Sequence, residues 1–596
     1  MRDLAYLKLL SREYPNIRAA ASDIINLQAI CGLPKGTEYF FSDLHGEHEA
    51  FIYLLRSSSG IIREKIRETF GHIISEEDEV RLANLIYYPE KMINQIKQAN
   101  EYTEDWQKTA VYRLVQICRE VSSKYTRSKV RKKMPKEFSG VIDELLYVDN
   151  TDDNKTEYYS ELINTLIDVR VADSFIVVIC SLIRSLTIDN LHILGDIFDR
   201  GPRPDIILEE LMHFHDVDIQ WGNHDISWMG AATGNRACIC NVLRMALGYN
   251  GFDVLEDGYG INLRPLSMFA ERVYRDDPCT CFLPQILDKN IYDAVDPKLA
   301  AKMHKAIAVL QYKEEGQIIK RYPEYGMEER ILLSAIRYDR GTVTIDGKEY
   351  PMRDMNFPTV DPADPLRLTD EEEELLHTLE LSFRHNARLH EHVRFLYSNG
   401  SMYKCCNSNL LYHGCIPMTE NREFDGLMVG GKMYRGKELM DFIDTQVKNA
   451  YFLPEDAPEK EACRDFMWYL WNGAKSPVFG KDKNRSFEHY FIEDPEVMRE
   501  TMNPYYQLSE EEETCDMILK EFGLPTKGSH IINGHMPVKI KSGETPIRAG
   551  GKLFIIDGGL SKAYQERTGI AGYTLIFNSH HLALAEHKPF DPERER

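Results

Sequence analysis

The stretch "NLHILGDIFDRGPRPD", residues 190–205, places a short apolar run directly before two aspartates and an arginine. The run "LHIL" predicts a buried strand, and Pro204 predicts the first turn of a helix over "PDIILEELMHF" (204–214). Because "DVDIQW" (216–221) predicts another strand, this order is typical of a crossover unit in a helix-covered sheet. Carboxylates at the end of a buried strand are costly without a cation or hydrogen-bond donors, which raises the question of a metal or a phosphate.

Strand-like segments that end in a polar residue or a glycine recur along the chain: "EYFFSD" (38–43), "NLLYHG" (409–414), "GSHIINGH" (528–535) and "KLFIIDGG" (552–559). Long stretches between them carry charged helical patterns, and residues 1–30 also have apolar positions at helical spacing. The polar stretch "YVDNTDDNKTEYYS" (147–160) predicts a linker. The basic stretch "KYTRSKVRKK" (124–133) predicts a solvated helix face rather than a binding site. The sequence therefore predicts one α/β core with large, mainly helical insertions.

The predicted boundaries follow from this alternation of patterns. We expect an N-terminal helical segment at 1–36 and helical insertions at 60–189, 251–399 and 426–525. The core is expected to be assembled from four stretches of the chain: 37–59, 190–250, 400–425 and 526–585.

Composition and charge limit the classes of function. The chain has 596 residues and a net charge of −22, which argues against broad, sequence-independent nucleic-acid binding. Its N-terminus does not have the pattern of a signal peptide, and the longest apolar run, "FIVVICSLI" (175–183), is too short to span a membrane. We expect a soluble, cytoplasmic protein.

The 12 cysteines are expected to be free thiols, since no signal peptide is recognised. The pairs Cys238/Cys240 and Cys279/Cys281 and the adjacent Cys405/Cys406 lack the C-x-x-C spacing that is typical of zinc sites. We therefore expect no metal at the cysteines.

Metal-binding side chains follow five of the predicted strands. The stretches are "FSDLHGE" (Asp43, His45), "LGDIFDRG" (Asp196, Asp199, Arg200), "WGNHD" (Asn223, His224), "LYHGC" (His413) and "INGHMP" (His535). Each has a structural interpretation of its own, because a strand-end aspartate can cap a helix and a lone histidine can belong to the core. Their joint occurrence instead indicates a mixed nitrogen and oxygen site for manganese, iron, zinc or magnesium. Such ligands would converge at the carboxyl ends of the strands.

These stretches resemble the calcineurin-like metallophosphatase superfamily, and within it the phosphoprotein-phosphatase branch. That pattern runs D-x-H, G-D-x-x-D-R-G, G-N-H-E or G-N-H-D, and then two isolated histidines. "YHGCIP" is similar to the family's H-G-G-x-x-P, with Cys415 in place of the second glycine. The resemblance implies a four-layer α/β sandwich, in which two sheets flanked by helices hold a dinuclear metal site.

The chain departs from the protein phosphatases in its long intervals between these stretches. The gaps from Asp43 to Asp196, from His224 to His413 and from His413 to His535 are all enlarged. With "GNHDISWMGAATG" and "FSDLHGEHEAF", they are similar to the class III fructose-1,6-bisphosphatases of Bacillus and related Firmicutes. This resemblance covers essentially the whole chain and implies gluconeogenic hydrolysis of fructose 1,6-bisphosphate to fructose 6-phosphate and phosphate.

The resemblance also implies roles for individual residues. Asp43, His45 and Asp196 would hold one metal ion, and Asp196, Asn223, His413 and His535 would hold a second. A hydroxide shared by the two ions would attack phosphorus in line. Arg200 would help to stabilise the phosphoryl oxygens, while His224, oriented by Asp199, would protonate the departing alkoxide.

The substrate's second phosphate needs cations away from the metals, and the candidates are Arg236, Lys539, Lys541 and Arg548. For each of them an ordinary surface cation is an equally good interpretation. The resemblance implies manganese as the favoured metal, with phosphoenolpyruvate and AMP as effectors. We also expect a homo-oligomer.

Three other functions share parts of this pattern. A protein serine/threonine phosphatase or a dinucleoside polyphosphate hydrolase would have the same metal core without needing the long insertions. An inactive scaffold would be expected to have lost at least one ligand, whereas this chain keeps every one.

Overall fold

The structure is a computed structural model that describes residues 2–32, 36–147, 153–286, 296–562, 565, 568–578 and 581–590. Two larger sheets lie at its centre, and the first has six strands in the order β16-β15-β1-β2-β3-β7. Its strands are β1 (Glu38–Phe41), β2 (Asn190–Ile193), β3 (Val217–Gln220), β7 (Gly400–Ser401), β15 (Tyr573–Phe577) and β16 (Leu582–Glu586). Strands β1, β2, β3 and β7 are parallel, while β15 and β16 are antiparallel additions at one edge. The predicted crossover unit is confirmed, because helix α12 (Pro204–Met212) connects β2 to the parallel strand β3.

The second sheet has five strands in the order β13-β14-β12-β9-β8. They are β8 (Tyr403–Cys406), β9 (Asn409–Tyr412), β12 (His530–Asn533), β13 (Ile547–Arg548) and β14 (Leu553–Ile555). Lys404 of β8 places its Nζ atom 2.5 Å from Asp218 of β3, so the two sheets meet at this point. Helix α18 (Ala387–Asn399) packs on β3 and β7, and α23 (Glu512–Glu521) packs on β12.

The central strands are short and almost entirely buried. Every residue of β1, β3 and β9 is buried, as expected for strands that are covered on both faces. Helices α3 (His48–Arg56) and α13 (Asn223–Thr233) follow β1 and β3 directly. All residues of α13 are buried, so the loop that precedes it has a rigid support.

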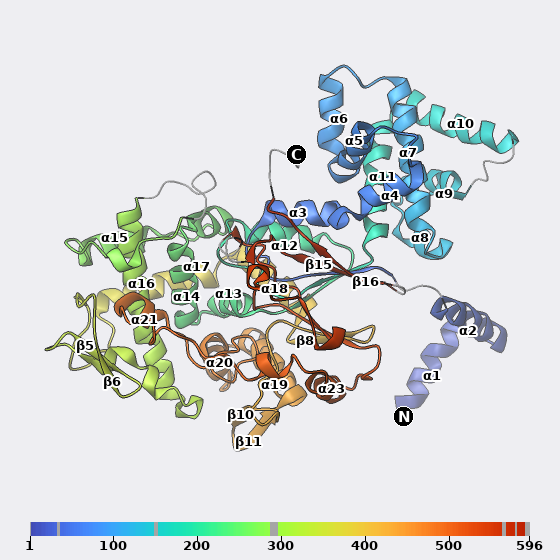
Figure 1. Ribbon diagram of the computed structural model, residues 1–596. Helices are drawn as coiled ribbons and strands as arrows, with labels where there is room; N and C mark the ends of the chain where they lie inside the picture. The colour runs from blue at the N-terminus through green and yellow to red at the C-terminus, as the bar shows by residue number, and fades with distance from the viewer. Residues whose placement is uncertain are drawn as a thin grey trace.

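Helices α4–α11 form a unit of their own, seen in Figure 1 as a group set apart from the sheets. They are α4 (Ile61–Phe70), α5 (Glu76–Tyr87), α6 (Pro89–Gln98), α7 (Glu104–Ser122), α8 (Arg127–Lys133), α9 (Ser139–Tyr147), α10 (Asp153–Asp168) and α11 (Ala172–Thr187). Their buried apolar side chains make a hydrophobic core that is separate from the core around the sheets.

Residues 236–286 and 296–399 instead share the core of the sheets. Their helices are α14 (Arg236–Gly248), α15 (Arg264–Val273), α16 (Pro297–Arg321), α17 (Asp370–Arg384) and α18. Strands β4 (Ile336–Arg337), β5 (Thr342–Ile345) and β6 (Lys348–Pro351) form a small antiparallel sheet that the sequence patterns did not indicate.

Residues 426–525 also pack into the core of the sheets. They form β10 (Gly426–Val429), β11 (Lys432–Arg435), α19 (Gly436–Phe452), α20 (Lys460–Asn472), α21 (Ser486–Phe491), α22 (Tyr505–Leu508) and α23. The hairpin of β10 and β11 is a second departure from the expected helical pattern.

Two further expectations need correction. The predicted linker at 147–160 lies partly within α10, which begins at Asp153; residues 148–152 of that prediction lie outside the described residues. The basic stretch of α8 is not simply a solvated face, because Lys129 and Lys133 place their Nζ atoms 2.5 and 2.9 Å from the carboxylate of Asp189. These ion pairs join the α4–α11 unit to the chain just before β2.

The predicted N-terminal helices are α1 (Arg2–Glu13) and α2 (Ile17–Cys31). They expose several large apolar side chains, among them Leu7, Ile17 and Ile25. Among the described residues, no helix has both the length and the apolar character that crossing a bilayer requires.

Candidate active site

The strand-end residues that the sequence singled out come together where the two sheets adjoin. Asp43 and His45 follow β1, Asp196 follows β2, Asn223 and His224 begin α13 after β3, His413 follows β9, and His535 follows β12. All are buried except His535, which is partly buried. Strands of both sheets therefore contribute to one cluster.

The loops of this cluster have an unusual backbone. Asp43, His45, Asp196, Asp199, Arg200 and His535 all have positive φ, between 43° and 73°. L-amino acids other than Gly, Asn and Asp seldom adopt this region, and the strain tends to be retained at functional sites. Hydrogen bonds between neighbouring loops hold it in place: Asp43 N donates to Gly195 O (3.0 Å), and His45 N donates to Asp196 O (2.9 Å).

Close approach of the loops explains two of the glycines in the quoted stretches. A side chain at Gly222 would overlap the carboxylate of Asp196, and one at Gly534 would overlap Ser42 and Asp43. Glycine thus allows the β3 loop to lie against Asp196 and the β12 loop to lie against Asp43.

Two groups of possible metal ligands overlap at one carboxylate. His45, Asp196 and His224 form one group, while Asp196, His413 and His535 form the other; within each, one ligand atom per residue lies within 4.8 Å of the others. Asp196 belongs to both, which is the arrangement that a ligand bridging two cations requires.

The remaining donors fit divalent cations. Among the described residues, Asn223 Oδ1 is buried and accepts no hydrogen bond, although a buried carbonyl oxygen ordinarily has a donor or a cation. Asp43 lies beside the second group, because its Oδ2 accepts a hydrogen bond from His535 N at 3.0 Å. Carboxylate and amide oxygens together with imidazole nitrogens form a ligand set suited to a divalent transition metal or magnesium.

Three imidazoles are oriented by backbone carbonyls. His45 Nδ1 lies 3.0 Å from Phe198 O, His413 Nδ1 lies 2.6 Å from Leu194 O, and His535 Nε2 lies 3.0 Å from Phe479 O. Metal-binding histidines usually hold such a partner on the ring nitrogen that does not coordinate. The opposite nitrogens face the cluster: His45 Nε2 lies 2.9 Å from an Arg200 guanidinium nitrogen, and His413 Nε2 lies 3.1 Å from His535 Nδ1.

The charges of the cluster compensate one another. Burial alone would raise the pKa of Asp196, but His413 above all holds that pKa well below its usual range. In the same ion pair, burial lowers the pKa of His413 while Asp196 raises it, to about 10. Burial and neighbouring cations keep the pKa of His45 well below its usual range, so this ring is neutral at neutral pH. The cluster therefore combines a carboxylate that stays ionised with a neutral imidazole that can act as a ligand.

His224 is held by a carboxylate that is itself anchored. Its Nδ1 lies 2.6 Å from Asp199 Oδ2, and Asp199 Oδ1 accepts a hydrogen bond from Trp228 Nε1 at 2.8 Å. Arg200 lies between two imidazoles, with its guanidinium nitrogens 2.9 Å from His45 Nε2 and 3.4 Å from His224 Nε2. The predicted partner of His224 is thus in hydrogen-bonding contact with it.

Comparison with known proteins decides the family. The model of the Firmicute fructose-1,6-bisphosphatase family matches residues 5–596. The chain belongs to this family. It is 52% identical to "Fructose-1,6-bisphosphatase class 3" of Clostridium tetani, covering 100% of this chain and 89% of that one. Proteins of the same name from Bacteroides fragilis and Alkaliphilus metalliredigens are each 52% identical, over 99% of this chain and 89% of theirs. No solved structure matches.

Among the predicted phosphate-binding cations, Arg236 and Arg548 form ion pairs with carboxylates. Arg236 of α14 pairs with Glu373 (2.8 Å) and Glu380 (3.1 Å), both of α17. Arg548 pairs with Glu510 at 2.5 Å. Lys539 and Lys541 are exposed, on the segment that follows the His535 loop.

Sequence reasoning missed two buried aspartates of the bisphosphatase cluster. Asp225 accepts hydrogen bonds from the backbone N–H groups of Asp196, Ile197 and Gly222, at 2.8, 2.8 and 3.0 Å. Asp557 follows β14, and burial and its neighbour Asp43 raise its pKa well above the usual range. Both lie in quoted stretches, "WGNHD" and "KLFIIDGG", where their position after a strand was the available signal.

Residues from 426–525 also reach the site, which the sequence patterns gave no means of predicting. The Trp471 ring lies edge-on to His224, with centroids 5.0 Å apart. Its Nε1 atom is buried and makes no hydrogen bond among the described residues. Phe479 supplies the carbonyl that orients His535. This segment therefore forms part of the wall of the site.

Proposed function

We propose that this chain is a metal-dependent phosphatase that hydrolyses fructose 1,6-bisphosphate to fructose 6-phosphate and phosphate. The observation that carries the proposal is the pair of ligand groups sharing Asp196, found in a chain that belongs to the Firmicute fructose-1,6-bisphosphatase family. Identity of 52% across the full length of the chain supports the same substrate as in the relatives' printed name.

We further infer that the core is a calcineurin-like four-layer sandwich. The support is the pair of sheets that meet at Lys404 and Asp218, with α18 on one sheet and α23 on the other. The separate hydrophobic core of α4–α11 supports an insertion at 60–189 that folds as its own unit. The insertions proposed at 251–399 and 426–525 share the main core, and the second of them also lines the site.

The donor set fits two divalent cations. Asp43, His45 and Asp196 would hold one, and Asp196, Asn223, His413 and His535 would hold the other. When bound, such ions supply an activated water nucleophile and withdraw charge from the phosphoryl group. Among divalent ions we propose manganese, which accepts the carboxylate, amide and imidazole ligands present here.

The protein's own groups have complementary tasks. His224 holds a proton at Nε2 for the departing sugar oxygen, and its bonded partner Asp199 keeps the ring in that orientation. Trp228 fixes the second oxygen of Asp199. Arg200 would bind the equatorial phosphoryl oxygens, since its guanidinium already lies between His45 and His224.

The substrate's second phosphate would lie away from the cations. Lys539 and Lys541, which are exposed on the segment after the His535 loop, are the predicted contacts that solvent reaches most readily, and Arg236 and Arg548 would have to leave their carboxylate partners. Binding of phosphoenolpyruvate and AMP, and assembly into a homo-oligomer, stay predictions.

Phosphate release from a substrate panel tests the proposed function. The full chain, stripped of metal and then supplied with Mn²⁺, is assayed with fructose 1,6-bisphosphate, a phosphoserine peptide and diadenosine tetraphosphate. We expect rapid release from the sugar bisphosphate and none after chelation. Preference for the peptide would favour a protein phosphatase, and preference for the dinucleotide would favour a dinucleoside polyphosphate hydrolase. No activity on any of them, with metal bound, would favour a scaffold.

A further inference from the structure

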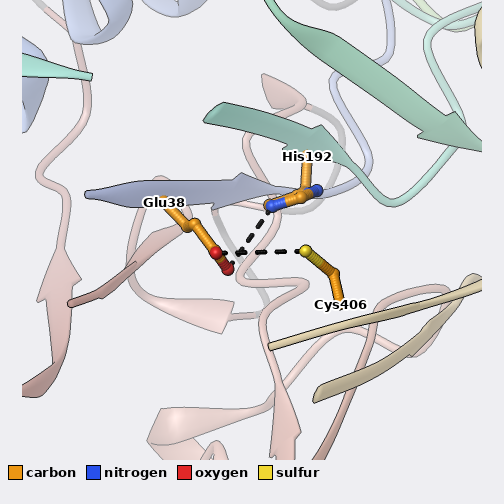
Figure 2. Close-up of side chains that lie close together, drawn as sticks. All are labelled: Glu38, His192 and Cys406. Atoms are coloured by element: carbon orange, nitrogen blue, oxygen red, sulfur yellow. Dashed lines mark hydrogen bonds and ion pairs between the residues drawn. The ribbon is translucent and has the colours of Figure 1, made fainter. Parts of the chain in front are cut away.

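A second cluster of metal-ligating side chains lies between the two sheets. Glu38 is the first residue of β1, His192 lies in β2, and Cys406 is the last residue of β8. One ligand atom from each residue lies within 4.8 Å of the others. Figure 2 shows the three side chains converging, with a dashed line from the carboxylate of Glu38 to each of the other two. We call these three residues the inter-sheet cluster.

Strand register explains why these side chains meet. His192 lies opposite Phe40 of β1 and opposite Asp218 of β3, and Glu38 is two residues before Phe40, on the same face of β1. From the second sheet, Lys404 and Cys406 are also two residues apart on one face of β8. The neighbouring Cys405 is exposed. This convergence depends on sheet pairing, so cysteine spacing could not reveal it.

Two atoms of the cluster face each other without hydrogen-bond partners. Glu38 is 2% exposed and His192 is 0% exposed. Among the described residues, neither Glu38 Oε2 nor His192 Nε2 makes a hydrogen bond, and they are 3.6 Å apart. Leaving such atoms without a hydrogen bond inside a protein is costly. Two ligands bound to one tetrahedral zinc ion lie about 3.4 Å apart, given bonds of roughly 2.1 Å, so a cation would fit between them.

The other polar atoms of these two side chains, His192 Nδ1 and Glu38 Oε1, already have hydrogen-bond partners. His192 Nδ1 lies 2.8 Å from Asp218 Oδ2, and Lys404 bonds the same carboxylate at 2.5 Å. Asn407 donates a hydrogen bond to Glu38 Oε1. An imidazole whose far nitrogen is bonded to a carboxylate is the usual arrangement around zinc-bound histidine.

We propose that the inter-sheet cluster is a structural site for a zinc-class divalent cation, bound by Glu38 Oε2, His192 Nε2 and the Cys406 thiolate. A water molecule would complete a tetrahedral set. The thiolate selects against magnesium, calcium and manganese, which prefer oxygen ligands, and with the carboxylate it balances two positive charges. Cys406 is partly exposed and Asn407 is exposed, which gives the ion a route from solvent.

A buried proton is the alternative occupant. Burial lowers the pKa of His192, but the neighbouring carboxylates of Asp218 and Glu38 raise it, to about 9. The metal-free cluster would then be an imidazolium between two carboxylates. Its thiol would contribute only the hydrogen bond from Cys406 Sγ to Glu38 Oε1 (3.9 Å), whereas a zinc-class ion would use all three side chains as ligands.

Metal content and a cobalt spectrum distinguish the two occupants. The full chain is prepared in the Asp196→Asn background, from which we expect the catalytic cations to be lost, and its zinc is measured. We expect one zinc ion per chain to remain. Replacement by Co²⁺ should give a near-ultraviolet thiolate-to-cobalt band, which a site built from oxygen and nitrogen alone cannot produce.

Matched variants assign the band to the cluster. Cys406→Ser should lose the band and the zinc ion, while Cys405→Ser, its exposed neighbour, should keep both. Glu38→Gln keeps the thiol and should still weaken zinc retention by at least tenfold. Hydrolysis of fructose 1,6-bisphosphate with Mn²⁺, measured with Asp196 intact, confirms that each variant has folded.

Absence of both zinc and the cobalt band in the parent chain would overturn the proposal in favour of the proton. Survival of the band in Cys406→Ser would also overturn it. The band reports a cysteine ligand whether or not Asp196 bridges two cations. Failure of this proposal is therefore distinguishable from failure of the proposed function.

Discussion

Strands β1 and β2 carry two polar clusters that are built in different ways. The cluster after their carboxyl ends is held by the backbone. Its loops have left-handed residues, backbone N–H groups donate to the carboxylates of Asp196 and Asp43, and backbone carbonyls orient three imidazoles. The inter-sheet cluster is held by side chains, with Asp218 on His192 and Asn407 on Glu38. The strand-end cluster also contains Arg200 beside the imidazoles of His45 and His224, whereas the inter-sheet cluster contains the thiol of Cys406.

We expect the first cluster to carry out the reaction and the second to stabilise the fold. Strained loops and a mixed set of oxygen and imidazole ligands suit exchangeable divalent cations that must accept a phosphate. A carboxylate, an imidazole and a thiolate placed between two sheets suit an ion that stays bound and ties the sheets together. Changes in the first cluster should therefore abolish turnover, and changes in the second should affect stability.

The largest effect is expected for Asp196→Asn. Since Asp196 belongs to both ligand groups, its loss should remove both cations and reduce phosphate release to background. Asp43→Asn should chiefly weaken one cation. Metal content per folded chain measures the contrast, and equal stoichiometry in the two variants would contradict a bridging role.

His224→Gln should reduce turnover by ~10²–10⁴, the usual effect of losing a positioned proton donor, while both cations remain. The loss should appear in kcat, because the proton is needed only in the transition state. It should shrink for an aryl phosphate with an acidic phenol, and Asp199→Asn should give a smaller loss of the same kind. Equal impairment on the sugar and the aryl substrate would contradict the assignment.

Asp225→Asn should lower metal affinity by ~10–100-fold, the usual effect of changing a residue that supports the ligands. Its carboxylate accepts three backbone hydrogen bonds, and an amide NH₂ group cannot replace an accepting oxygen. Saturating Mn²⁺ should restore most of the kcat. A Mn²⁺ titration of activity measures this, and an unchanged apparent Kd would show that Asp225 does not support the site.

The smallest effect on activity is expected for Cys406→Ser. With Mn²⁺ supplied, kcat should equal that of Cys405→Ser, because the inter-sheet cluster does not touch substrate. The melting temperature should fall relative to Cys405→Ser only when zinc is present during folding. Loss of kcat in a folded variant would mean that the two clusters are coupled.

The sequence predicted the cluster at the strand ends better than its surroundings. Strand ends are visible as apolar runs followed by aspartate, asparagine or histidine, so the convergence of Asp43, Asp196 and His413 could be expected. The role of Asp225 depends on which backbone N–H groups face it. Trp471 reaches His224 only because α20 packs against α13, a contact between distant segments that no local pattern encodes.

Local sequence patterns also predicted only part of the fold. The crossover at β2 and β3 followed from local order, whereas the small sheet of β4–β6 and the hairpin of β10 and β11 lie in segments dominated by helical periodicity. The linker prediction at 147–160 was wrong from Asp153 onward, because polar composition alone cannot exclude a helix that packs on α7. The inter-sheet cluster was invisible for a related reason, since Glu38, His192 and Cys406 meet only through sheet pairing.

Electron paramagnetic resonance during a Mn²⁺ titration tests the proposed dinuclear centre most directly, with hydrolysis of fructose 1,6-bisphosphate followed on the same samples. We predict that the second equivalent replaces the signal of isolated Mn²⁺ with that of an exchange-coupled pair, and that activity rises with the coupled signal. Asp196→Asn should show neither change. A spectrum that remains the sum of isolated ions, or full activity before a second ion binds, would contradict two cations sharing Asp196.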